Sequence, residues 1–137
     1  MVLKDKERII LNKLNNFFLT DPLTETTCEY CRYDASNKNY ILEIKYMGKF
    51  YKGALIEFDK FSYNIMYSKM KNKQFIYAAR MENKIYIFNV TKLLALNYDF
   101  DWTWRDMPLT TNFKSNKRIQ KLIGYIDINK NVKECNI

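Results

Sequence analysis

The sequence predicts one mixed α/β (α+β) domain in which a central mixed β-sheet is flanked by helices. Its 137 residues match the usual size of a single domain. Hydrophobic residues make up 47% of the chain, enough for a core, and 3 glycines and 2 prolines leave little material for linkers. Helical and strand-like spacings also alternate, in the order helix, two or three strands, helix, two strands. A less regular extension is expected from about residue 91.

Two segments have the hydrophobic spacing of amphipathic helices. Residues 4–20 form the first, and Asp21-Pro22 ends it because the residue before proline avoids helical geometry. Residues 54–71 form the second. The expected apolar positions of the two helices are, in order, Ile9, Ile10, Leu14, Phe17 and Phe18, then Leu55, Phe58, Ile65, Met66 and Met70.

Short runs rich in β-branched and aromatic residues predict the strands. A polar cluster at residues 36–39 is typical of a turn, with a short strand before it and a second strand at residues 40–46. Residues 74–79 and 84–90 predict two more strands, joined by a turn at 81–83. The remaining expectations are a connection at 23–29, a loop at 47–52 and a short helical turn at 91–96.

The last third of the chain has a weaker pattern. Residues 101–105 and 107–112 are expected to form an ordered loop, and residues 115–125 either a basic helix or a strand at a sheet edge. Trp102 and Trp104 are expected to cover the core, although a base-stacking platform is the alternative.

The charge favours a polyanionic partner. Lysine and arginine number 23 against 15 acidic residues, which gives a net charge of +8 and a pI near 9.3. Nucleic acid is the first such partner to consider, and a solvated lysine-rich surface is the alternative. The candidate contacts are Lys49, Lys52, Lys114, Lys117, Arg118 and Lys121.

Several kinds of chemistry are excluded by composition. The chain has no histidine, so Ser-His-Asp and Cys-His hydrolysis and histidine-ligated zinc are ruled out. Three cysteines are too few for a structural zinc site, and we expect Cys28 and Cys31 to be ordinary reduced thiols. No apolar run approaches the roughly 18 residues that span a bilayer, and the charged N-terminal segment lacks the apolar stretch of a signal peptide. A cytoplasmic protein without membrane contact is expected.

Charged residues on the predicted strand 40–46 suggest a catalytic site. Side chains on a strand alternate between its faces, so Glu43 and Lys45 lie opposite Leu42 and Ile44 and should open onto a surface or cleft. Asp34 precedes Glu43 by nine positions across the turn, and antiparallel pairing can bring the two carboxylates together. Such a pair suits Mg²⁺ or Mn²⁺, beside which Lys45 can position a water. The alternative is a solvated strand face in a chain with 28% charged residues.

This arrangement resembles the PD-(D/E)XK nuclease superfamily, with its restriction-endonuclease-like fold. Asp34 matches the family's aspartate, and Glu43-Ile44-Lys45 matches its (D/E)-x-K. Glu7 matches a glutamate that many members carry on the first helix. The resemblance covers residues from about 4 to 90, and Tyr33 stands where the family usually has proline.

The resemblance implies a metal-dependent endonuclease, resolvase-like or restriction-like, that cuts DNA, branched and single-stranded forms included, or less often RNA. Asp34, Glu43 and the Ile44 main-chain carbonyl would bind Mg²⁺, Lys45 would orient the water, and Glu7 would reach a second ion or a water. It also implies a homodimer and a phage or mobile-element origin. Glu57, expected on the second helix, is either an auxiliary residue or an exposed helical glutamate. Two alternatives stay open: a catalytically inactive nuclease-fold protein that binds nucleic acid or a host protein, and a protein-interaction module.

Overall fold

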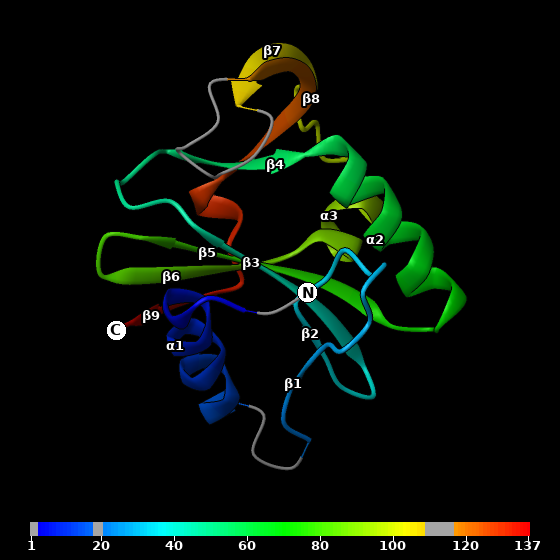
Figure 1. Cartoon of the computed structure of the whole chain (residues 1–137), viewed down its shortest axis with the longest axis vertical. Helices are drawn as coiled ribbons and strands as arrows, with labels where there is room; N and C mark the ends of the chain where they lie inside the picture. The colour runs from blue at the N-terminus through cyan, green and yellow to red at the C-terminus, as the bar shows by residue number, and fades with distance from the viewer. Residues whose placement is uncertain (1–2, 18–20, 109–116) are drawn as a thin grey trace.

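Two β-sheets and three helices make up the part of the chain that the computed structural model describes, residues 3–17, 21–108 and 117–137 (Figure 1). The helices are α1 (Asp5–Leu14), α2 (Phe58–Met70) and α3 (Val90–Ala95). Sheet A has the order β1-β2-β3-β5-β6-β9, formed by β1 (Thr24–Glu25), β2 (Ala35–Ser36), β3 (Tyr40–Tyr46), β5 (Gln74–Met81), β6 (Lys84–Asn89) and β9 (Lys133–Asn136). Sheet B has the order β4-β8-β7, formed by β4 (Gly53–Glu57), β8 (Arg118–Asp127) and β7 (Thr103–Pro108). The predicted mixed α/β class is confirmed. None of the described helices has the length and apolar character needed to cross a bilayer.

Strand β3 lies inside sheet A and pairs with its two neighbours in different directions. It is antiparallel to β2 and parallel to β5, with Glu43 opposite Tyr77 and Lys45 opposite Ala79. A parallel pair needs a long crossover connection, which β4 and α2 provide here. Because the crossover leaves sheet A and returns to it, α2 and sheet B are placed over one face of β3.

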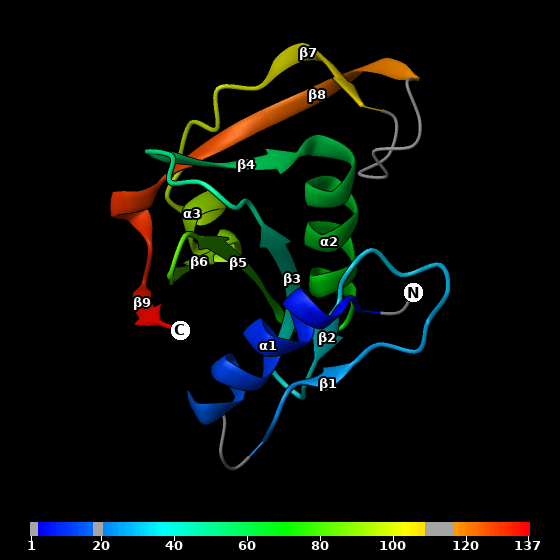
Figure 2. The ribbon, with the colours of Figure 1, turned by 60° about the vertical axis from the view of Figure 1, so that its left-hand side comes forward.

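Helices cover both faces of sheet A (Figure 2). On one face α1 packs its buried residues against Leu42 and Ile44. On the other face Ile41, Phe75 and Tyr77 belong to a second core, to which α2 and sheet B contribute. The second core also contains Phe61 and Ile65 of α2, Ala54 and Ile56 of β4, and Ile126 of β8.

The first helix ends earlier than expected. Helix α1 stops at Leu14, and a 3₁₀ turn at Asn15–Phe17 follows it, while residues 18–20 of the predicted helix lie outside the described residues. The Asn15 side chain donates to the Leu23 carbonyl at 2.9 Å and accepts from the Leu23 amide at 2.8 Å. These two bonds fix the end of the helical segment to the start of the connection, within which Thr24 and Glu25 form β1.

The start of the second predicted helix is wrong. Gly53–Glu57 forms strand β4, and α2 begins only at Phe58. Ala54 and Ile56 of β4 are both buried, and β4 pairs antiparallel with β8. Packing and pairing with a distant strand therefore override the local helical spacing.

The predicted apolar stripe of this helix is also wrong in part. Met66 and Met70 are 59% and 74% exposed. The buried side chains of α2 instead include two polar ones, Asn64 and Ser68, spaced one helical turn apart. A polar side chain at a core-facing position is uncommon, so Asn64 is a candidate functional residue of α2.

The region after residue 91 is more regular than expected. Residues Arg118–Asp127 form β8, between β4 and β7, so the strand alternative holds for the described part of 115–125, although as an inner strand. Residues Thr103–Pro108 form β7 in place of an ordered loop, and residues 109–112 lie outside the described residues. Trp102 packs against the core as expected, whereas Trp104 is 66% exposed and the expectation was wrong.

The expectation of reduced thiols is likewise wrong for two cysteines. Cys28 and Cys31 form a disulfide across a Cα–Cα distance of 5.4 Å, within the usual range for such bonds. Cys135 is a free thiol. The disulfide closes the segment just before Tyr33 and Asp34.

Candidate functional site

The β2–β3 hairpin places Asp34 beside Glu43. Ala35 pairs with Leu42, so Asp34, the residue before Ala35, lies across from Glu43. The Asp34 amide donates to the Leu42 carbonyl at 2.7 Å, and its carboxylate Oδ2 accepts from the Ile44 amide at 2.6 Å. Asn37 stabilises the turn, since its Oδ1 accepts from the amides of Asn39 and Tyr40. Local hydrogen bonds therefore suffice to bring the two acids together.

The main-chain carbonyl of Ile44 faces the same edge of β3 as Asp34. The Leu42 carbonyl and the Ile44 amide both bond to Asp34, on the β2 side. Within a strand the N–H and C=O of one residue point to the same neighbour, so the Ile44 carbonyl is also directed toward that side. Asp34 and this carbonyl can thus contribute oxygen atoms to one position.

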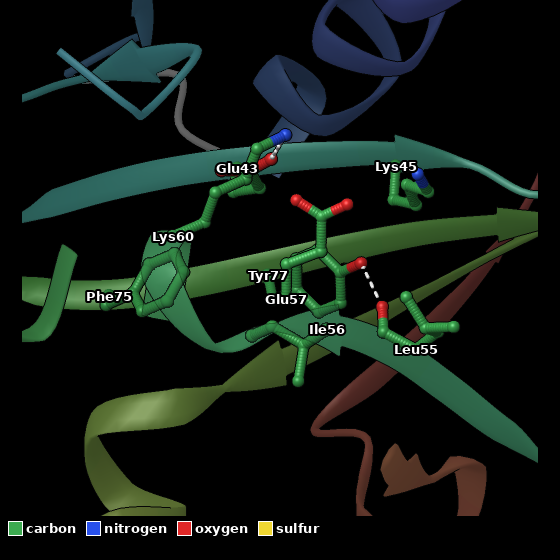
Figure 3. Close-up of a pocket in the computed structure, with 8 residues that line it drawn as sticks. All are labelled: Glu43, Lys45, Leu55, Ile56, Glu57, Lys60, Phe75 and Tyr77. Atoms are coloured by element: carbon green, nitrogen blue, oxygen red, sulfur yellow. Dashed lines mark hydrogen bonds and ion pairs between the residues drawn. The ribbon is translucent and has the colours of Figure 1, made fainter. Parts of the chain in front are cut away.

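Glu43 is more buried than the sequence suggests. Its face of β3 is covered by α2, and the residue is only 6% exposed. Its Oε1 lies 3.3 Å from Lys60 Nζ (Figure 3). Its Oε2 lies 3.4 Å from Asn64 Nδ2. Both partners come from α2, four residues apart on one helix face.

Lys45 and Glu57 continue this cluster. Lys45 is partly buried on the Glu43 face of β3, and the Glu57 carboxylate points from the end of β4 toward the gap between Glu43 and Lys45 (Figure 3). Glu57 Oε1 lies 3.1 Å from Lys121 Nζ, with side-chain exposures of 17% and 22%. The expectation that Glu57 lies on a helix was wrong. A cavity of about 10 Å³ between these side chains can admit about one water.

A larger groove connects the cluster with Glu7. The groove has a volume of about 580 Å³ and is lined by the first residues of α1, by Glu43 to Met47 and by Lys60. Glu7 lies in this lining, and its charge acts on Asp34, which is 5% exposed. At the same groove Lys6 Nζ lies 4.5 Å from the centre of the Tyr46 ring. The structure therefore brings Glu7, Asp34, Glu43 and Lys45 to one region.

Burial makes both acids harder to ionise. It raises the pKa of Asp34 to about 6, an effect that the Ile44 amide opposes and the charge of Glu7 increases. It raises the pKa of Glu43 to about 8, where Lys60 opposes the rise and Asp34 adds to it. Desolvation is the main reason that the charged forms of these two neighbouring acids are disfavoured, and a bound cation would favour them.

The pKa values of Lys45 and Lys60 shift in opposite directions. Burial lowers the pKa of Lys45, and the positive charge of Lys60 lowers it further. Burial also acts to lower the pKa of Lys60, but the charges of Glu43 and Glu57 outweigh it, and the net shift is upward. Lys60 is therefore the cation that accompanies Glu43, while Lys45 is the lysine that releases a proton more readily.

The residues at this site fit a hard divalent cation. Two carboxylates and a main-chain carbonyl are the oxygen ligands that Mg²⁺ and Mn²⁺ prefer. Asn64 Oδ1 is a further oxygen beside Glu43, buried and without a hydrogen-bond partner in the structure. Within the described ranges no three His, Cys, Asp or Glu side chains lie close enough together to hold a metal ion by themselves. Water and substrate would have to complete the coordination, as is usual for Mg²⁺.

The predicted basic contacts fall in different places. Lys121 lies at the site, paired with Glu57. Lys49 and Lys52 are exposed in the segment between β3 and β4. Lys117 and Arg118 are exposed at the start of β8, where Arg118 Nε lies 2.8 Å from Asp106 Oδ2. Lys114 lies outside the described residues.

Sequence reasoning missed Lys60 and Asn64. A signal for them existed, because a polar pair four residues apart among the apolar positions Phe61 and Ile65 faces the core. The assumed early helix start and the stripe through Met66 and Met70 concealed it. With the correct start at Phe58, the inner face of α2 becomes partly polar at the level of Glu43.

The sequence matches no protein-family model and no curated protein. By its fold and its site, the chain is a mixed α/β protein with two adjacent buried carboxylates and flanking lysines. The likeness to PD-(D/E)XK nucleases rests on the residues of this chain alone.

Proposed function

We propose that this protein is a metal-dependent endonuclease of the PD-(D/E)XK type that hydrolyses phosphodiester bonds in DNA, with Mg²⁺ or Mn²⁺. One observation carries the proposal. Asp34, just before β2, and Glu43 of β3 are buried across from each other, and Lys45 follows on the Glu43 face at a groove. Burying two neighbouring acids is costly for folding, which favours a functional reason for the arrangement.

Each residue has a role that follows from its position. Asp34, Glu43 and the Ile44 carbonyl would hold the metal ion, which when bound supplies positive charge and lowers the pKa of a water. Lys45, with its lowered pKa, would hold the attacking water and exchange a proton at Nζ. Lys60 would leave Glu43 as the metal takes its place and could then contact a phosphate oxygen. Glu7 would orient a further water or ion at the groove.

The proposal extends to the assembly. A homodimer would present two such sites, one for each strand of a duplex, and a role in the cytoplasm of a phage host belongs to the same proposal. Light scattering of the purified protein at several concentrations measures the assembly. A monomer at all concentrations would limit the protein to nicking or to single-stranded substrates.

One observation favours a second candidate, a catalytically inactive nuclease-fold protein that binds nucleic acid or a host protein. Glu43 is already contacted by Lys60 and Asn64, so it has partners without a metal ion. In this case Asp34 and Glu43 would have no catalytic role, and the basic surface would bind the nucleic acid or host protein.

A cleavage assay separates the two candidates. Linear duplex, branched and single-stranded DNA are incubated with the protein and Mg²⁺ or Mn²⁺, with EDTA as the metal-free control. We expect cleavage that requires metal and that falls about 100-fold or more in Lys45→Ala, the usual size of a general acid–base contribution. Lys38→Ala, an exposed lysine in the hairpin turn, is the matched control and should cut normally. If the wild type does not cleave DNA, or if Lys45→Ala cleaves it equally well, the proposed nuclease activity is contradicted.

A further inference from the structure

Part of sheet B extends beyond its neighbours as a two-stranded ribbon. Strand β4 pairs with β8 from Ile123 to Asp127, whereas β7 pairs with β8 from Arg118 to Ile123. The β7–β8 ribbon, defined as residues 103–108 and 118–122, therefore continues past the end of β4. Figure 2 shows β7 and β8 running above β4 and the first turn of α2.

An exposed tryptophan lies on this ribbon. Trp104 is 66% exposed, and it belongs to β7, which is the edge strand of sheet B. Trp102, two residues earlier, packs against Phe58 and Phe61 with ring centres 5.0 and 4.9 Å away. Trp102 thus has a structural role that Trp104 does not share. A large exposed aromatic ring on an edge strand is available to stack on a ligand.

The charge around Trp104 is mainly positive. The ribbon and the residue preceding its second strand carry Arg105, Lys117, Arg118 and Lys121 against a single acid, Asp106. Arg118 pairs with Asp106, while the Arg105 guanidinium lies 5.8 Å from the centre of the Tyr125 ring. Aromatic rings interleaved with arginine and lysine are the contacts that hold single-stranded nucleic acid.

The ribbon is continuous with the candidate site. Lys121 belongs to the ribbon and pairs with Glu57, which points toward Glu43 and Lys45. A polymer bound along the ribbon therefore passes a lysine whose Nζ contacts an acid of the candidate site. Glu43 is recessed, and a flexible single strand reaches a recessed group more easily than a stiff duplex does.

We propose that the β7–β8 ribbon binds single-stranded nucleic acid, with a base stacked on Trp104 and phosphates held by Arg105 and Arg118. Trp104 and Arg105 are consecutive and point to opposite faces, so the bound strand crosses the free edge of β7. An unpaired base supplies the ring face that stacks on Trp104, whereas the bases of a duplex interior are stacked on each other. That the strand then enters the groove rests on the proposed function; the binding itself does not.

The test measures binding in EDTA, where metal-dependent cleavage cannot interfere. Full-length protein is titrated with a fluorescently labelled single-stranded oligonucleotide and with its duplex, by anisotropy and by tryptophan fluorescence. We expect quenching by the single strand and at least 5-fold weaker binding by Trp104→Ala, because one stacked base contributes about 1–3 kcal/mol. Trp104→Phe should keep most of the affinity, and Arg105→Ala should reduce the salt dependence. Lys69→Ala, an exposed lysine on α2, should bind as the wild type does.

The outcomes are distinct from those of the cleavage assay. Equal single-strand affinity of Trp104→Ala and wild type, or equal affinity of the wild type for the duplex, overturns the inference, provided that circular dichroism shows a folded variant. No cleavage by the wild type combined with Trp104-dependent binding in EDTA overturns the proposed function and leaves the inference standing. Metal-dependent cleavage without Trp104-dependent binding supports the proposed function and overturns the inference.

Discussion

The two faces of β3 differ more than any other pair of neighbouring surfaces described above. On one face Leu42 and Ile44 pack against α1 in a purely apolar core. On the other face Glu43 and Lys45 lie among charged side chains from α2, β4 and β8. One strand thus combines a wholly apolar face with a face on which the buried Ile41 is followed by Glu43 and Lys45, whose burial costs stability. Buried ionisable groups that cost stability in this way are retained mainly at functional sites.

The cost of the charged face comes from desolvation. Glu43 and Asp34 are almost fully buried, and burial is the main cause that raises the pKa of each. Lys60 compensates only in part, since its own side chain is 41% exposed and interacts with water. If the two faces have these separate roles, stability and activity should respond to different substitutions on the same strand.

The largest effect on stability is expected on the apolar face. Leu42 is completely buried, so Leu42→Ala should lower the free energy of unfolding by about 2–5 kcal/mol, through lost burial and a cavity beneath α1. Urea denaturation measures the change. Under the proposed function, the fraction of the variant that stays folded should cut DNA as the wild type does. Ile119→Ala, at a 41% exposed position, is the control and should change stability little. A loss below about 1 kcal/mol for Leu42→Ala would show that this face is not the stabilising one.

On the charged face, a substitution is expected to raise stability, by less than Leu42→Ala lowers it. The pKa of Glu43 lies at about 8 in the folded protein and 4.5 is its ordinary value, so between these values the folded state binds more protons than the unfolded state. Stability should therefore fall as pH rises through this window. Glu43→Gln removes this dependence and should be more stable than wild type at pH 8 in EDTA, by about 1–3 kcal/mol.

Thermal melting at pH 5 and pH 8 provides the measurement. The two proteins should melt more similarly at pH 5, where Glu43 is protonated in the folded wild type. If Glu43→Gln is less stable than wild type at both pH values, the Lys60 pair stabilises the fold on balance, and the contrast between the faces is smaller than proposed.

The smallest expected effect concerns Lys60. A metal ion held by Glu43 must compete with Lys60 Nζ, which lies 3.3 Å from Oε1. Lys60→Gln should therefore raise the affinity for Mn²⁺ about 3- to 10-fold, or roughly 1 kcal/mol, by calorimetry. Lys69→Gln, on the same helix, should leave it unchanged. A weaker affinity in Lys60→Gln would mean that Lys60 supports the metal site and does not compete with it.

The structural features that depend on residues near each other in the chain could be predicted from the sequence. Strand β3 spans Tyr40–Tyr46, the predicted range, because its alternation and the polar turn before it are both local features. The position of Asp34 relative to Glu43 followed from the same hairpin. The length of the strand and the separation of its two faces needed no knowledge of distant segments.

Features that depend on distant segments could not be predicted. Strand β4 reads as the start of a helix, and only its pairing with β8 makes it extended. Glu57, expected on an exposed helix, instead forms a partly buried ion pair with Lys121, 64 residues away in the chain. Trp102 and Trp104 look equivalent in sequence, yet Gly124 leaves room for the ring of Trp102 alone: a Cβ there would lie 2.9 Å from it.

The β2–β3 hairpin also has a consequence for the order in which the chain folds. Asp34 and Glu43 come from one local turn, whereas Lys60 reaches Glu43 across 17 residues and Lys121 reaches Glu57 across 64. Short-range contacts close at lower entropic cost and generally form earlier. The acids should therefore meet before Lys60 and Lys121 arrive, and during that interval Lys45 of the same strand and ions from the solvent are the counterions within reach.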